Sequence, residues 1–119
     1  MAGGRLTTHV LDTANGCPAA GISVRLFALD GDARTLLKTE ITNHDGRCDA
    51  PLLTSDSMRI GHYELIFEVA AYFRAKGTML TDPPFLDQVP IRFAIAQPDA
   101  HYHVPLLISP YAFSTYRGS

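Results

Sequence analysis

The chain has no long apolar run, no cluster of basic residues and only two cysteines. No stretch approaches the roughly 20 apolar residues that a bilayer-spanning helix needs, so no transmembrane helix is expected. Lysine and arginine number 10 against 12 aspartates and glutamates, so the net charge is −2 and a basic surface for nucleic acid is missing. The sequence therefore predicts neither a membrane nor a nucleic-acid partner.

An export signal is also missing from the start of the chain. Residues 1–9 lack the apolar core of a secretory signal, which predicts a cytoplasmic location. In a reducing compartment Cys17 and Cys48 are expected to be free thiols rather than a disulfide. Neither cysteine lies in a recognisable nucleophile motif, so both are interpreted as structural.

What is present is the composition of an ordinary soluble globular protein, with 46% hydrophobic and 18% charged residues. The length of 119 residues suffices for a single hydrophobic core but not for two. No internal repeat, linker or low-complexity stretch divides the chain. The sequence therefore predicts one domain over residues 1–119.

Short alternating segments separated by turn residues dominate the chain. Within residues 6–12, Thr7, His9 and Leu11 share one face of an expected strand. Turns are expected at Asn15–Pro18 and Asn43–Gly46. Strands are predicted over residues 6–12, 22–29 (with Ile22, Val24, Leu26 and Ala28 on one side), 35–42, 61–69, 89–96, 102–109 and 111–116, with a short helix over 70–77. This pattern predicts an all-β fold, a β-sandwich.

Histidines are the first candidates for chemistry. His101 and His103 lie two residues apart in an expected strand and so point to the same face. Such a pair can bind zinc with a third ligand from another strand, or can supply a base and a structural neighbour. His9 stands inside a strand, where an aliphatic residue or threonine would pack better. From position alone, a packed or surface histidine is the favoured interpretation of His9, and a functional histidine is the alternative.

A cation and the chain end complete the candidate set. Arg47 follows the Asn43–Gly46 turn and is either an exposed cation or a fork-shaped donor for a planar anion or carbonyl. The last residues, Tyr116 to Ser119, place a phenol, a guanidinium, a hydroxyl and the terminal carboxylate after a strand. No Gly-X-Ser-X-Gly motif and no glycine-rich phosphate loop is present, which argues against a serine nucleophile and a nucleotide site.

Several motifs together resemble those of the transthyretin-related family. They are Thr8-His9-Val10-Leu11-Asp12 with Gly16-Cys17-Pro18-Ala19, Thr42-Asn43-His44-Asp45-Gly46-Arg47, Gly61-His62-Tyr63-Glu64-Leu65, and His101-Tyr102-His103-Val104-Pro105-Leu106-Leu107 with Ser109-Pro110-Tyr111. The ending Ser114-Thr115-Tyr116-Arg117-Gly118-Ser119 resembles the enzyme branch of that family rather than its hormone-carrier branch. The resemblance covers nearly the whole chain.

This resemblance implies a fold, an assembly and an activity. The implied fold is a transthyretin-like sandwich of two four-stranded sheets with one short helix. The implied assembly is a homotetramer with active sites in the channel between paired dimers. The implied reaction is hydrolysis of 5-hydroxyisourate in urate breakdown, and because the ring carbonyl is already activated, neither a metal nor another cofactor is expected. A non-catalytic carrier of a small aromatic ligand is the alternative.

The resemblance also implies roles for individual residues. The catalytic set is expected to be His9, Arg47 and His103, with Tyr116, Arg117, Gly118 and Ser119 shaping the substrate pocket. One of the two histidines would deprotonate a water molecule, while Arg47 would stabilise the oxyanion that forms. Which histidine takes the proton does not follow from the sequence.

Overall fold

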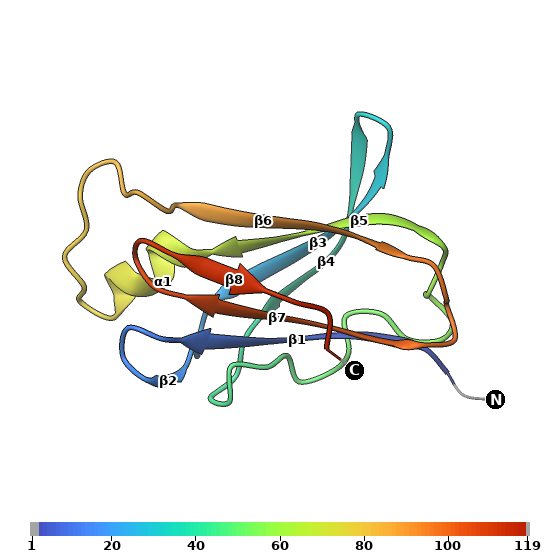
Figure 1. Ribbon diagram of the computed structural model, residues 1–119, viewed down its shortest axis with the longest axis horizontal. Helices are drawn as coiled ribbons and strands as arrows, with labels where there is room; N and C mark the ends of the chain where they lie inside the picture. The colour runs from blue at the N-terminus through green and yellow to red at the C-terminus, as the bar shows by residue number, and fades with distance from the viewer. Residues whose placement is uncertain (1–2, 119) are drawn as a thin grey trace.

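The computed structural model describes residues 3–118, which form two packed β-sheets and a short helix (Figure 1). One sheet has the strand order β2-β1-β7-β8 and the other β4-β3-β5-β6. The elements are β1 Arg5–Asp12, β2 Cys17–Pro18, β3 Ser23–Asp30, β4 Ala33–Ile41, β5 Gly61–Glu68, α1 Val69–Ala75, β6 Gln88–Ile95, β7 His101–Ile108 and β8 Phe113–Thr115. The predicted all-β sandwich of two four-stranded sheets with one helix is confirmed.

The core lies between the sheets and follows the alternation along each strand. On β1, Leu6 and Val10 are fully buried while Thr7 and His9 face outwards and are only partly buried. Fully buried side chains from the other strands are Val24, Leu26, Leu65, Phe67, Leu106 and Ile108. Removing each such side chain from water contributes about 1.5–3 kcal/mol, so the inward faces fix which residues are left outside.

One short strand was not predicted. Cys17 and Pro18, expected in a turn, form β2, which pairs with Leu11 and Asp12 at the edge of the first sheet. An edge strand tolerates proline because its missing N–H faces away from the ladder.

The predicted inward face of β3 is confirmed. Val24 and Leu26 are in the core, and Ala28 is half-buried against it. Phe27 lies opposite Glu64 on the outer face, where the Arg34 guanidinium covers its ring at 4.3 Å.

Parallel pairing of β1 with β7 brings together residues about 95 positions apart in sequence. Arg5 lies opposite His101 and Thr7 lies opposite His103. The chain end returns along β7 and finishes beside it (Figure 1). The outer face of this strand pair therefore brings together polar side chains from both ends of the sequence.

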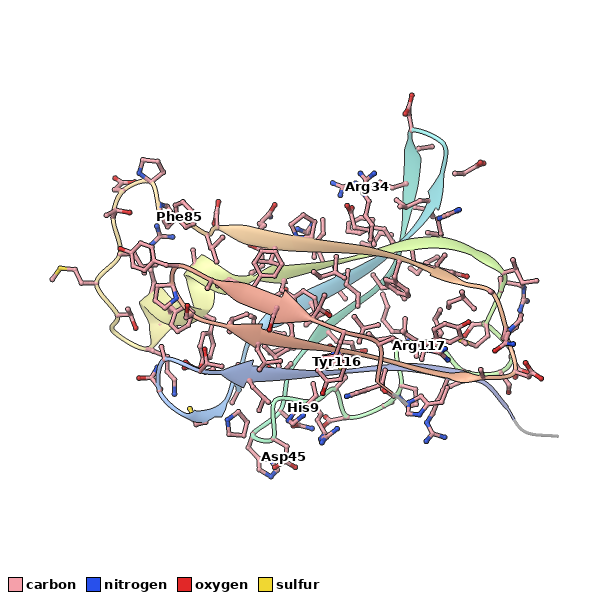
Figure 2. The ribbon with its side chains drawn as sticks, in the orientation of Figure 1. His9, Arg34, Asp45, Phe85, Tyr116 and Arg117 are labelled. Atoms are coloured by element: carbon pink, nitrogen blue, oxygen red, sulfur yellow. The ribbon has the colours of Figure 1, made fainter. Side chains whose placement is uncertain are left out.

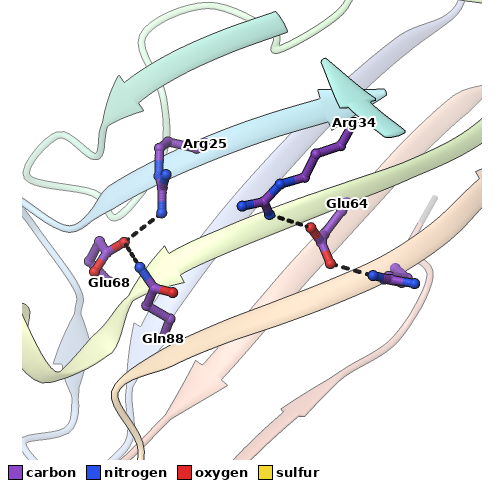
Figure 3. Close-up of polar contacts among 6 residues, drawn as sticks. Arg25, Arg34, Glu64, Glu68 and Gln88 are labelled. Carbon is purple, nitrogen blue, oxygen red and sulfur yellow. Dashed lines mark hydrogen bonds and ion pairs between the residues drawn. The ribbon is translucent and has the colours of Figure 1, made fainter. Parts of the chain in front are cut away.

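The outer face of the second sheet carries a buried carboxylate with two cations. Glu64 on β5 receives hydrogen bonds from the Arg34 and Arg92 guanidinium groups, each at 3.0 Å (Figure 3). Its side chain is only 5% exposed, and the pKa of Glu64 is nevertheless lowered because these two bonds outweigh burial. The arginines, from β4 and β6, cover Glu64 on the outer face. This cluster stabilises the sheet and lies on the sheet opposite the candidate site.

Helix α1 follows β5 directly; it begins one residue before the predicted span of 70–77 and ends two residues before the end of that span. Its apolar side packs Val69, Ala70 and Phe73 into the protein. Within residues 3–118, no helix has the length and apolar character needed to cross a membrane.

Candidate active site

The outer face of β1 and β7 holds a row of polar side chains. Thr7 and His9 project from β1, and His101 and His103 project from β7, because inward alternation leaves these positions outside. The hydroxyl of Thr7 lies 2.8 Å from Nε2 of His101 and 2.8 Å from Nδ1 of His103. The prediction that His101 and His103 share one face is confirmed.

The turn after β4 delivers Arg47 to this row. The side-chain oxygen of Asn43 accepts hydrogen bonds from the backbone N–H groups of Asp45 and Arg47, at 2.9 and 3.2 Å. Asparagine favours such turns because its amide replaces a backbone partner. Arg47 then forms an isolated antiparallel bridge with His9. The side chain of Arg47 is exposed, and it forms no ion pair within the described part of the chain.

Glycine is required at position 46 for this approach. Gly46 has a φ of 76°, and its carbonyl accepts a hydrogen bond of 2.8 Å from the Val10 N–H. A Cβ built on Gly46 would collide with the Val10 carbonyl oxygen. The close contact of backbone with backbone therefore holds Arg47 next to His9.

Replacing Gly46 with alanine is expected to lower both stability and activity. A side chain at positive φ costs about 1–3 kcal/mol, and the collision with Val10 adds to this cost and moves Arg47. Thermal unfolding and turnover measure the two effects. Gly31→Ala is the matched control, because Gly31 also has a positive φ of 60° but a Cβ there meets nothing within 4 Å. A Gly46→Ala protein as stable and active as Gly31→Ala would contradict this role.

The chain end closes the other side of His103. The Gly118 N–H donates a 2.7 Å hydrogen bond to the His103 carbonyl, and a Cβ on Gly118 would lie 2.8 Å from Cδ2 of the His103 ring. The Arg117 guanidinium stacks on the Tyr102 ring at 4.1 Å and also donates to the His101 carbonyl. Tyr116 is 62% exposed. Ser119, the last predicted site residue, lies outside the described residues.

Two adjoining cavities meet at His103. One, of about 460 Å³, is lined by Arg5, Thr7, Thr8, Arg47, Cys48, Asp49, Ala50, Pro51, His101 and His103. The other, of about 570 Å³, is lined by His103, Tyr116, Arg117 and Gly118. Figure 2 shows Tyr116 and Arg117 on the same side of the molecule as His9. The structure thus brings Arg47 and His103 to one cavity, and the chain end to the cavity next to it.

Electrostatics keep the two β7 histidines neutral. Burial, followed by the charges of Arg47, His101 and His9, lowers the pKa of His103 below its ordinary value of 6.5. Burial and the nearby Arg5 and Arg117 lower the pKa of His101. Neutral imidazoles are proton acceptors at neutral pH.

The nearby thiol is not a nucleophile at neutral pH. Burial, together with the negative charges of Glu40 and Asp49, raises the pKa of Cys48 to about 11. Only the thiolate attacks, so Cys48 stays inert. Both cysteines are free, as predicted.

His9 has one nitrogen already engaged. Its Nε2 lies 2.9 Å from the Asp45 carbonyl, an atom that only accepts, so Nε2 carries the proton (Figure 2). Nδ1 of His9 is therefore its only nitrogen with a lone pair. By contrast, Nδ1 of His103 meets the Thr7 hydroxyl.

Two residues of the first cavity escaped the sequence analysis, Thr7 and Arg5. Both share the outward face of β1 with His9, yet only the register with β7 shows that they meet His101 and His103. Concerning the zinc interpretation of the histidine pair, the described residues contain no group of three or more His, Cys, Asp or Glu side chains arranged to hold a metal ion.

This chain is similar in sequence and in fold to several known proteins. A 5-hydroxyisourate hydrolase from Mesorhizobium japonicum is 65% identical, over 98% of this chain and 94% of that protein. The crystal structure of (S)-allantoin synthase superposes with a TM-score of 0.94 at 49% identity, over 99% of this chain but 44% of that one, so this chain spans less than half of it. Sea bream transthyretin in complex with thyroxine has a TM-score of 0.84 at 26% identity, over 96% of this chain and 94% of that one.

The family model described as HIUase/Transthyretin family matches residues 6–118. That range includes β7, all of β1 except Arg5, the Asn43–Gly46 turn and the chain end up to Gly118. The chain therefore belongs to the HIUase/Transthyretin family.

Proposed function

We propose that this protein is a hydrolase that opens the six-membered ring of 5-hydroxyisourate, giving 2-oxo-4-hydroxy-4-carboxy-5-ureidoimidazoline in urate breakdown. The observation that carries the proposal is the meeting of a neutral His103 and the Arg47 guanidinium in one cavity. The 65% identity to a 5-hydroxyisourate hydrolase supports the same substrate. The whole chain is proposed to act as a single domain, and its cytoplasmic location stays a prediction.

His103 is the proposed general base. It borders both cavities, and its lowered pKa leaves it unprotonated at neutral pH. A water molecule gives one proton to the imidazole while its oxygen bonds to the ring carbonyl carbon. The ring C–N bond then breaks, and the leaving nitrogen takes the proton back from the imidazolium. A positioned base of this kind contributes roughly 10²–10⁴-fold.

Arg47 and His9 are proposed to act at the substrate carbonyl that water attacks. The planar guanidinium supplies several N–H donors for the oxyanion that forms when water adds. His9 is bridged to Arg47 through the backbone and is proposed to orient the substrate edge next to it. Tyr116, Arg117, Gly118 and Ser119 are proposed to bound the flat substrate, with the Arg117 backbone facing it because its side chain is occupied by Tyr102.

A homotetramer is proposed as the working assembly. Arg47 and Tyr116 are exposed in the single chain, so one chain alone does not shield the cavities from bulk water. A second copy facing this surface would enclose them. Analytical ultracentrifugation tests the assembly: a species of about four times 13.0 kDa is expected, and a monomer with full activity would contradict it.

Activity is expected to fall at acid pH with a midpoint below 6.5. His103 must be neutral to accept the proton, and its pKa is lowered from 6.5 by burial, Arg47, His101 and His9. The active form therefore persists to lower pH than it would with an unperturbed histidine. The pH profile of kcat/KM measures this, and an acid limb centred above 6.5 would contradict the assignment.

Turnover distinguishes the enzyme from the carrier alternative. Urate oxidase generates 5-hydroxyisourate in situ, and its ultraviolet absorbance is followed with the protein at a small fraction of the substrate concentration. A hydrolase drives the decay to completion at a rate proportional to protein. A carrier changes the signal only in proportion to its binding sites, and that result would replace the proposal with a binding function.

A further inference from the structure

The Thr7 hydroxyl links the imidazole of His103, a proposed catalytic residue, to that of His101, which has no assigned role. Its oxygen is 2.8 Å from Nδ1 of His103 and 2.8 Å from Nε2 of His101, while the two ring centres are 6.1 Å apart. The three side chains come from facing positions of β1 and β7, with Thr7 directly opposite His103. Strand register therefore builds the link, and no loop has to move to form it.

The proton count of this link allows three arrangements. A threonine hydroxyl has one proton and two lone pairs, so it donates to at most one imidazole and accepts from one or both. In the first arrangement His103 donates from Nδ1 to Thr7 and Thr7 donates to His101, and in the second both bonds run in the opposite direction. In the third, Thr7 accepts from both imidazoles and its proton points elsewhere. The tautomers of the two histidines are coupled in all three.

The chemistry of a base at His103 excludes the second arrangement. When Nε2 of His103 takes a proton from water, Nδ1 also carries one and needs an acceptor. Thr7 is that acceptor only if its own proton points away from His103, and Nε2 of His101, 2.8 Å away, offers an acceptor for that proton in the first arrangement. In the opposite arrangement the hydroxyl proton would face the Nδ1–H group and oppose the imidazolium.

Charges around His101 keep it neutral, as the first arrangement requires. Arg5 on β1 and Arg117 in the C-terminal segment both disfavour a proton on His101, as does its burial. The groups facing His103 are Arg47, His101 and His9, and they leave it neutral at rest. A neutral His101 has one unprotonated ring nitrogen, and when this is Nε2 it accepts the Thr7 proton, which is the first arrangement. On its other side the His103 ring packs against Gly118, which fixes the ring plane.

We propose that Thr7 and His101 are positioning residues that hold His103 in the tautomer with Nδ1 protonated and Nε2 free to act as the base. The inference rests on the proposed hydrolase function. Thr7 fixes the ring and stabilises its protonated form, and His101 fixes the direction of the Thr7 hydroxyl.

Matched variants at position 7 test the role of the hydroxyl. Thr7→Val keeps the branched shape and removes the hydroxyl, whereas Thr7→Ser keeps the hydroxyl. Thr7→Val is expected to lower kcat by about 10–100-fold, as for other outer hydrogen-bond partners of functional histidines, with a much smaller change in KM. Thr7→Ser is expected to stay near wild type. Equal activities of the two folded variants would overturn the proposal.

The pH profile gives the direction of the bond. Without the Thr7 acceptor the His103 imidazolium is less stable, so the acid limb of kcat/KM in Thr7→Val is expected to move to lower pH. A shift to higher pH would mean that Thr7 donates to His103, which contradicts the proposal. A double variant of Thr7→Val with His101→Phe is expected to be no worse than the poorer single variant, because both break one link. Fully additive losses would overturn the link.

Nitrogen NMR of the histidine rings tests the tautomers in the wild-type protein without any substitution. His103 is expected to carry its proton at Nδ1 and His101 to have an unprotonated Nε2, and the reverse pattern would overturn the proposal. Wild-type turnover is measured first. Absent turnover would refute the proposed function itself, whereas normal turnover with reversed tautomers would refute only the inference about Thr7 and His101.

Discussion

Replacing His103 with asparagine is expected to lower kcat/KM for 5-hydroxyisourate by roughly 10²–10⁴-fold, the contribution typical of a positioned general base. Asparagine has a similar size and its amide can still donate to Thr7, so the strand pairing of β7 is kept. It cannot accept a proton from water at neutral pH. Initial rates of absorbance decay, measured on protein with a wild-type far-UV spectrum, give the effect.

His62→Asn is the matched control for this prediction. His62 lies on β5 in the other sheet and is exposed, so the same substitution there is expected to leave the rate unchanged. If His103→Asn behaved like His62→Asn, His103 would not be the base. A large loss in both would indicate a general effect on the protein rather than on the site.

Deleting residues 116–119 is expected to reduce turnover to the rate of buffer while the far-UV spectrum stays that of the wild type. The deletion removes the Gly118 hydrogen bond to the His103 carbonyl, the packing of Gly118 on the His103 ring and the Arg117 stack on Tyr102. The deletion therefore removes the residues that pack against one side of the His103 ring. Strand β8 ends at Thr115, and the buried core residues all precede the deleted segment, so the sandwich is retained.

A short glycine-serine extension provides the control for the deletion. Placed after Ser119, the extension is expected to impair turnover, because the chain end is proposed to lie in the substrate pocket. The same extension placed before Met1 is expected to have no effect on turnover. Full activity of both the deletion and the C-terminal extension would remove Tyr116 to Ser119 from the site.

Much of the fold follows from sequence because alternation is a local signal. The outward positions of Thr7 and His9 and the inward positions of Leu65 and Phe67 were predictable from period-two patterns alone. The prediction was wrong where the pattern is broken by pairing. Pro18 pairs with Leu11 in an edge strand, although its residue type indicates a turn.

The site was only partly predictable, since its parts meet through long-range register. The spacing of His101 and His103 indicates a shared face, and the Asn43–Gly46 turn indicates that something is presented after it. Nothing local connects Thr7 to either histidine, because threonine on an outward strand face is common. The parallel pairing of β1 with β7 brings these residues together, and no local sequence pattern predicts that pairing.

Stopped-flow absorbance of freshly generated 5-hydroxyisourate, comparing the wild type with the triple variant His9→Asn, Arg47→Gln, His103→Asn, tests the central claim most directly. The wild type is expected to accelerate the decay in proportion to its concentration. The folded triple variant is expected to match buffer, with a loss smaller than the product of the three single losses, because groups that act as a unit are not additive. A folded triple variant as fast as the wild type would contradict the account, and so would a wild-type protein no faster than buffer.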